Sequence, residues 1–217
     1  MTQSRRKFLT TSSAGIAGGM FWTPGVMAEQ LTVTSKLAEG PFYPDKMPLD
    51  TDNDLLLIND SINPGIGEVT HLSGRVLTAN GSPVRNAVVE IWQVDGKGVY
   101  LHTKSSDAEK RDANFQGFGR FLTDSKGQYY FRTVKPVPYP GRTPHIHFAI
   151  NQGGKRVLTT QMLIKGNPQN EKDGLFKRVK DKKKRDTLLA DFKPLAGSAV
   201  GELQVNFDVV LGITPKG

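Results

Sequence analysis

With 217 residues, the chain is long enough to bury one hydrophobic core without covalent cross-links. It contains no cysteine, which excludes disulfide bonds, a thiolate nucleophile and cysteine-bound zinc or iron–sulfur sites. Its 23 glycines and 13 prolines favour a turn-rich β architecture over a helical bundle. Much of the formal net charge of +8 comes from two stretches, Arg5–Lys7 and Lys172–Arg185, so the charge alone does not indicate a nucleic-acid partner.

The first 28 residues have the pattern of an export signal. Arg5 and Arg6 precede a weakly apolar stretch interrupted by Thr, Ser and Gly, and the segment ends in Val26-Met27-Ala28, which suits signal peptidase. The pattern resembles a twin-arginine signal, whose export machinery transports folded proteins. A membrane anchor would need about 20 strongly apolar residues. Cleavage after Ala28 would therefore leave a periplasmic or secreted protein without a membrane anchor; the alternative is a disordered N-terminal tail.

From residue 70 onward, short apolar runs alternate with turn residues. This pattern predicts strands over residues 71–79, 87–94, 128–134, 145–151, 156–164 and 203–209. The fourth and fifth of these would form a hairpin around Gly153-Gly154. Strands at such spacing predict an all-β fold, a β-sandwich. Residues 29–69 lack a regular pattern and are expected to form an N-terminal extension that packs on the core, leaving 70–217 as the sandwich domain.

Residues 171–195 form the one segment expected to be helical, and it contains the basic run Lys182–Arg185. Such a run can bind nucleic acid or an anionic polymer. Here acidic residues, including Asp181 and Asp186, are interspersed, and no aromatic residue lies among the lysines as a base-stacking platform would require. A solvated surface is therefore predicted, with no nucleic-acid partner.

One segment combines residue types that can bind a metal ion. Alternate side chains of a strand share a face, roughly 6.6–7 Å apart at the backbone, so His145 and His147 should point the same way. A His-x-His pair alone is equally typical of structural histidines. Tyr139 and Arg142, a few residues upstream, strengthen the interpretation as a metal site.

Several blocks of the sequence resemble the intradiol ring-cleaving dioxygenases, which use non-haem ferric iron. These blocks are Glu39–Pro44, Asp52–Leu55, Leu72–Tyr100, Phe115–Phe131, Lys135–Pro140, Pro144–Phe148 and Thr160–Met162. The resemblance extends over roughly residues 38 to 211. It implies the β-sandwich core of that family, with an irregular N-terminal wrap and one or two short helices.

The resemblance also implies a ligand set of Tyr100, Tyr139, His145 and His147 around one Fe(III) ion per chain. Ferric iron is a hard ion that favours anionic oxygen ligands. A phenol has an ordinary pKa of about 10, and a bound cation strongly favours its deprotonated form. Two phenolates and a hydroxide would balance the trivalent charge in a buried pocket.

Further roles follow from the same resemblance. Arg142 would stabilise negative charge on the substrate ring, although it could also be a surface salt-bridge partner, and Gln161 would donate or accept a hydrogen bond. Tyr139, once displaced from the metal by the substrate, would accept a proton. Tyr43 either lines the substrate pocket or simply packs. Gly141 replaces a bulky aromatic residue of protocatechuate enzymes, which predicts a more open pocket and an altered substrate range.

The implied reaction cleaves a catechol-type ring between its two hydroxyl-bearing carbons with O2 and yields a cis,cis-muconate-type diacid. The partners would be a small aromatic diol, O2, the twin-arginine export machinery and, in a homo-oligomer, further copies of the chain. An alternative is an exported, non-catalytic β-sandwich binding module with a residual zinc or copper site. The two tyrosines argue against that alternative, because zinc sites are rarely built from two phenolate ligands. Binding of an anionic polymer through the Lys-rich stretch rests on charge alone.

Overall fold

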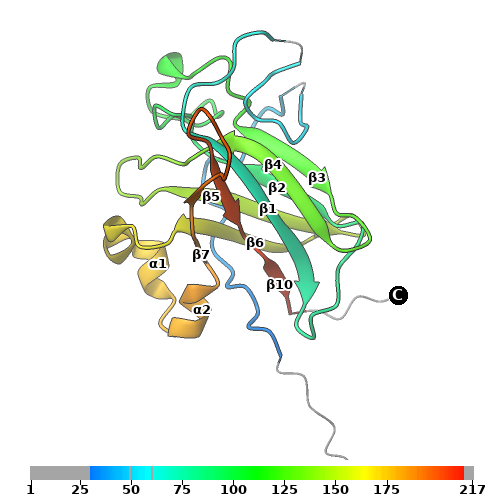
Figure 1. Ribbon diagram of the computed structural model, residues 1–217. Coiled ribbons are helices and arrows are strands. Elements are labelled where there is room, and N and C mark those ends of the chain that lie inside the picture. The colour runs from blue at the N-terminus through cyan, green and yellow to red at the C-terminus, as the bar shows by residue number, and fades with distance from the viewer. Residues whose placement is uncertain (1–29, 49, 60, 213–217) are drawn as a thin grey trace, which may run out of the picture.

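The computed structural model describes residues 30–212 except 49 and 60, so the predicted export signal at 1–28 lies outside the described residues. The described part contains two five-stranded sheets (Figure 1). The first sheet consists of β1 (Val69–Thr78), β4 (Gln128–Val134), β8 (Lys193–Pro194), β9 (Leu203–Asn206) and β10 (Val209–Leu211). The second consists of β2 (Val88–Trp92), β3 (Phe118–Leu122), β5 (His145–Gln152), β6 (Lys155–Ile164) and β7 (Leu189–Ala190). This arrangement confirms the predicted all-β sandwich.

The two sheets share one hydrophobic core. Phe148 of β5 lies 6.0 Å, between ring centroids, from Tyr129 of β4 and 5.0 Å from Phe207. Ile146 and Ile150 on the same face of β5 are fully buried in this core. Because alternate residues of a strand face opposite ways, His145 and His147 lie on the outer face of the second sheet. The chemistry-bearing residues of β5 thus lie outside the space between the sheets.

In the first sheet, β1 pairs antiparallel with β4 and parallel with both β9 and β10. The single strand predicted over 203–209 is therefore wrong, because it is two strands that share β1 as a partner. The break lies at Asp208, whose side chain accepts a hydrogen bond from the Arg75 backbone N–H at 2.9 Å, where a strand partner would otherwise bind. The predicted burial of Val205, Phe207 and Val209 is nevertheless correct.

In the second sheet the strand order is β3-β2-β5-β6-β7. The predicted hairpin of β5 and β6 is confirmed, and its turn uses Gly153 and Gly154 at φ of 55° and 73°, a conformation that favours glycine. The pairing aligns His147 with Gln161 of β6 and with Trp92 of β2. These three side chains therefore stand side by side on the outer face.

The helical segment predicted over 171–195 is wrong as one element. It contains the end of a 3₁₀ turn, η2 (Pro168–Lys172), then α1 (Gly174–Arg178), α2 (Lys182–Asp186) and the short strands β7 and β8. Asp173 and Asp181 each cap the start of a new helix and thereby interrupt a continuous one. One further 3₁₀ turn, η1 (Ala108–Lys110), lies between β2 and β3. No helix in the described part of the chain is both long and apolar enough to cross a membrane.

The segment before β1 forms no helix or strand among its described residues. It nonetheless bonds to both sheets: Thr34 N–H donates to Val210 of β10 at 3.0 Å, and Leu37 N–H donates to Thr159 of β6 at 3.1 Å. In Figure 1 its blue trace runs along the sandwich. The segment then covers part of the outer face of the second sheet, where the histidines lie.

Candidate metal centre and active site

The two histidines of β5 present their Nε2 atoms to one point. His145 donates from Nδ1 to the backbone carbonyl of Thr143 at 2.6 Å, which leaves Nε2 with a free lone pair. The two Nε2 atoms are 3.1 Å apart. Burial, followed by the charge of Arg142, lowers the pKa of His145 to about 4, and burial lowers the pKa of His147 well below its ordinary value. Both rings are therefore neutral near pH 7, as metal binding requires.

His147 is held by the second sheet. Its ring stacks on Trp92 of β2, with centroids 4.8 Å apart and an angle of 9° between the planes. Its Nδ1 atom is buried and has no hydrogen-bond partner among the described residues. Stacking thus fixes the plane of the ring, and Nε2 is the atom that faces the neighbouring donors.

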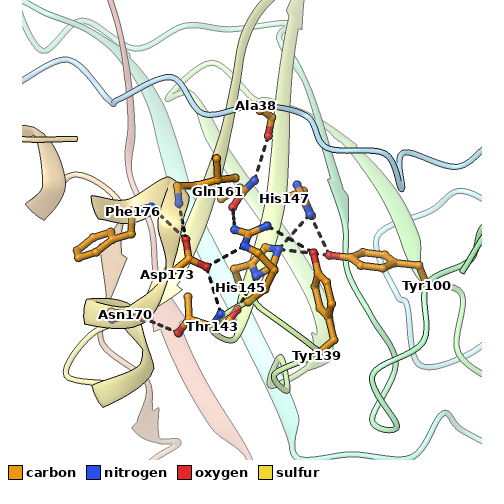
Figure 2. A network of polar contacts seen from close by, with 12 residues as sticks. Ala38, Tyr100, Tyr139, Thr143, His145, His147, Gln161, Asn170, Asp173 and Phe176 are labelled. Carbon is orange, nitrogen blue, oxygen red and sulfur yellow. Dashed lines mark hydrogen bonds and ion pairs between the residues drawn. The ribbon is translucent and has the colours of Figure 1, made fainter. Parts of the chain in front are cut away.

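Tyr100 and Tyr139 complete the cluster from two loops. The Tyr100 hydroxyl lies 2.9 Å from Nε2 of His147 and 3.3 Å from Nε2 of His145. Burial, with Tyr139 as a smaller cause, raises the pKa of Tyr100 well above 10, so only a bound cation would make it a phenolate at neutral pH. The Tyr139 ring lies 5.4 Å from that of Tyr100 and 5.6 Å from that of His145, between centroids. The structure thus brings all four predicted ligands together (Figure 2).

These donors fit a metal ion. Two ligands that are each about 2.0–2.2 Å from one ion and near a right angle lie about 3 Å apart, as the hydroxyl of Tyr100 and the two Nε2 atoms do. Converging lone pairs in a buried site are stabilised by a cation. Two phenols with two imidazoles suit a hard trivalent ion. Among the described residues there is no cluster of three or more His, Cys, Asp or Glu able to bind a metal.

Arg142 lies beside the ligands and is not a surface salt-bridge partner. Its side chain is only 16% exposed and forms an ion pair from Nε to Asp173 at 2.7 Å. Nη1 donates to the Tyr139 hydroxyl at 3.4 Å, and Nη2 donates to the Gln161 amide oxygen. Gln161 in turn donates to the Ala38 carbonyl at 3.0 Å. Figure 2 shows this network continuing from the N-terminal segment to Tyr139.

A cavity of about 440 Å³ opens next to this network. Its lining includes Tyr139, Gly141, Arg142, Lys172 and Asp173. Gly141 has a φ of 80°, and no atom of the part of the chain that the structure describes lies within 4 Å of the position that a Cβ would occupy. The cavity is therefore open on the side of Gly141.

Tyr43 does not line this cavity. Its hydroxyl donates to Glu90 at 3.1 Å, and its ring packs edge-on against Trp92 at 5.0 Å. Its neighbour Phe42 is closer to the ligands, because its ring stacks on Tyr100 at 4.8 Å and 18°. Phe42, Trp92 and Asp173 were not predicted as site residues, although the first two lie within the blocks that carry the resemblance.

Comparison with known proteins gives the family. The family model described as Dioxygenase matches residues 38–212. The protocatechuate 3,4-dioxygenase beta chain of Burkholderia cepacia is 37% identical over 178 residues, which cover 77% of this chain and 73% of that protein. The catechol 1,2-dioxygenase of Acinetobacter baylyi is 30% identical over 158 residues, which cover 64% of this chain and 49% of that protein. The chain thus spans about half the length of the catechol relative.

A solved structure agrees with the sequence relatives. The dioxygenase domain of a dioxygenase–carbohydrate-binding fusion protein from Streptomyces sp. SirexAA-E has 30% sequence identity and a TM-score of 0.64. The match covers 84% of this chain and 100% of that domain. The chain therefore belongs to the intradiol ring-cleavage dioxygenases, a family of oxidoreductases that act on aromatic compounds.

Proposed function

We propose that the chain is an Fe(III) enzyme that cleaves a catechol-type ring between its two hydroxyl-bearing carbons with O2, giving a cis,cis-muconate-type diacid. The observation that carries the proposal is the convergence of two phenols and two imidazoles beside a cavity large enough for an aromatic diol. Tyr100, Tyr139, His145 and His147 would hold the iron. Bound Fe(III) would supply the Lewis acidity that keeps the diol deprotonated and activates its ring.

The protein side chains contribute proton transfer and electrostatics. Tyr139 is half-buried and lines the cavity, so its phenolate can accept a proton from an incoming diol. Arg142 lies on the same cavity wall, where its guanidinium group can stabilise negative charge on the substrate. Phe42 and Trp92 pack against Tyr100 and His147 and exclude water from the ligands.

Colour and oxygen uptake test the proposal. The chain loaded with ferric iron should contain about one iron per chain, show the red-purple absorption of phenolate-to-iron charge transfer, and consume O2 with a catechol. The products should be muconate-type diacids. A well-folded protein that stays colourless and cannot be loaded with iron would instead support the non-catalytic binding module. Extradiol products would contradict the proposed position of cleavage.

The same oxygen-uptake assay measures the range of substrates. We propose a broader range than in enzymes with a bulky residue at the cavity mouth, because Gly141 leaves that side open. Oxygen uptake should therefore be compared for catechol, protocatechuate, hydroxyquinol and alkylcatechols. We also propose that copies of the chain form a homo-oligomer, which size-exclusion chromatography of the same preparation tests.

We also propose export by the twin-arginine machinery, on the basis of Arg5 and Arg6. The double substitution Arg5→Lys with Arg6→Lys keeps the charge and removes both guanidinium groups. In a bacterium with this pathway, the full chain should be found in the periplasm and the double variant in the cytoplasm, measured by cell fractionation. Lys7→Gln, which leaves the arginine pair intact, serves as the control. Equal export of the double variant would contradict the proposal.

A further inference from the structure

Asp173 is a fully buried carboxylate that joins two elements of the structure. It precedes α1, where Oδ1 accepts the backbone N–H groups of Leu175 at 2.9 Å and Phe176 at 3.0 Å. Its other oxygen, Oδ2, accepts from Arg142 Nε at 2.7 Å and from the Thr143 backbone N–H at 3.2 Å. One carboxylate oxygen thus caps a helix, and the other fixes the loop that leads into β5.

A second contact ties the same two segments together. Asn170 accepts a hydrogen bond from the Thr143 hydroxyl at 2.7 Å and donates to the Ile164 carbonyl at 2.9 Å. The carbonyl of Thr143 accepts from Nδ1 of His145. The connection from β6 to α1 therefore contacts the residues that orient one imidazole and the guanidinium of Arg142 (Figure 2).

Helix capping alone does not explain why a buried aspartate stands at position 173. Asn and Ser cap helices about as well as Asp does. Asp181 caps α2 in the same way, through Lys184 N–H at 3.0 Å, but Asp181 is exposed. A buried carboxylate is costly unless it is paired, and its pair here is Arg142. Burial raises the pKa of Asp173, but the hydrogen bond from Arg142 and further hydrogen bonds outweigh burial and leave this pKa lowered, so the group is ionised near neutral pH.

The ion pair with Asp173 orients the two remaining nitrogens of Arg142. With Nε bound to Asp173, Nη1 is directed at Tyr139 and Nη2 at Gln161. Because the guanidinium is planar, contacts on three sides fix both its position and its plane. We propose that Asp173 is a positioning residue that holds Arg142 against Tyr139 and Gln161, which makes the connection from β6 to α1 a wall of the active site. This inference rests on the proposed dioxygenase function.

Asp173→Asn tests the inference in the iron-loaded full chain. The amide oxygen can still cap α1, but the amide NH2 then faces the Nε–H of Arg142, so two donors meet and the guanidinium moves. Displacement of a positioned group by about 1 Å costs on the order of 100-fold in rate, so kcat should fall about 10- to 100-fold with KM changed less than about threefold. Asp181→Asn, an equivalent change at the cap of α2, should leave kcat unchanged.

A double-mutant cycle that combines Asp173→Asn with Arg142→Lys shows whether Asp173 acts through Arg142. The double variant should have a kcat within about threefold of Arg142→Lys alone, because coupled positions are not additive. Additive losses, or a wild-type kcat in Asp173→Asn, would overturn the proposal. If Asp173→Asn does not fold, Asp173→Ser replaces it, since serine caps the helix but is too short to reach Arg142. Failure of both cap-preserving variants to fold would also overturn it, because Asp173 would then serve the fold alone.

A second readout does not depend on turnover. In the full chain with Ga(III), a diamagnetic ion of the same charge as Fe(III), the Nε–H of Arg142 should give a slowly exchanging NMR signal, assigned by its loss in Arg142→Lys. In Asp173→Asn this proton should exchange at least about tenfold faster. Unchanged exchange would contradict the positioning role. If the wild type oxidises no catechol, the proposed function fails, while the exchange rate still tests Asp173.

Discussion

Replacing His147 with alanine is expected to abolish both the red-purple colour and the oxygen uptake of the iron-loaded chain. His147 faces Tyr100 at 2.9 Å and His145 at 3.1 Å, so its loss removes one donor from the centre of the cluster. Changes that only disturb the support of a metal ligand cost about 10- to 100-fold in affinity or activity, so loss of the ligand itself should cost more than about 100-fold. Iron content after dialysis and the charge-transfer absorbance measure the effect.

The control for this prediction is His71→Ala. His71 lies on β1 in the first sheet and contacts Tyr130 at 2.6 Å, outside the cluster. Both variants remove an imidazole, but only His147→Ala should lose iron. Circular dichroism must show that each variant is folded, because His147 is buried against Trp92. Full iron content and full colour in folded His147→Ala would remove His147 from the ligand set.

The parts of the fold that could be predicted follow from local patterns. Strict alternation placed His145 and His147 on one face of β5, and the Gly153-Gly154 turn fixed the hairpin with β6. The resemblance to a known family then connected this strand with two tyrosines outside it. Tyr100 precedes His145 by 45 residues, and Tyr139 lies in the loop before β5. Periodicity alone contains no information on which loops converge at a strand. Tyr139 was noticed because it lies close to the histidines, but its role as a ligand, and Tyr100 altogether, depended on the resemblance.

The features that were missed depend on contacts between distant segments. β9 and β10 read as one strand because their alternation continues through Asp208, but in the gap between them the Arg75 N–H bonds to the Asp208 side chain and the Phe207 carbonyl accepts from the Tyr129 hydroxyl. Likewise, Phe42 and Tyr43 are adjacent aromatics, and no local signal shows which of them stacks on Tyr100. Asp173, like Asp181 and Asp186, was interpreted as one of the acids interspersed in the solvated basic segment, because its partner Arg142 is 31 residues away.

Substituting Arg142 should separate catalysis from iron binding. Arg142→Gln leaves all four proposed ligands in place, so colour and iron content should persist. The variant loses the positive charge on the cavity wall next to Tyr139, and removal of one preorganised electrostatic group costs about 10²- to 10³-fold in kcat. Arg142→Lys keeps the charge but not the planar fork, so its loss should be smaller. Oxygen uptake under saturating catechol measures kcat.

The matched control is Arg132→Gln, which breaks a partly buried pair with Asp54 at 2.8 Å on the first sheet. This variant should keep wild-type kcat. A folded, iron-loaded Arg142→Gln with wild-type turnover would show that Arg142 does not act on the substrate.

Acid unfolding gives a second signature of Arg142→Gln. Arg142 contributes to holding the pKa of Asp173 below its ordinary value in the folded wild type. The stability from this pair is therefore fully present above the carboxyl's unfolded pKa of about 4, and it is lost as the pH falls through the lowered pKa of the folded state. Without Arg142, less opposes the effect of burial, so the pKa of Asp173 should rise. The variant then lacks this stability at neutral pH and should unfold at a higher pH than the wild type. Circular dichroism during acid titration measures the shift, and coincident midpoints would mean that Asp173 does not depend on Arg142 for its charge.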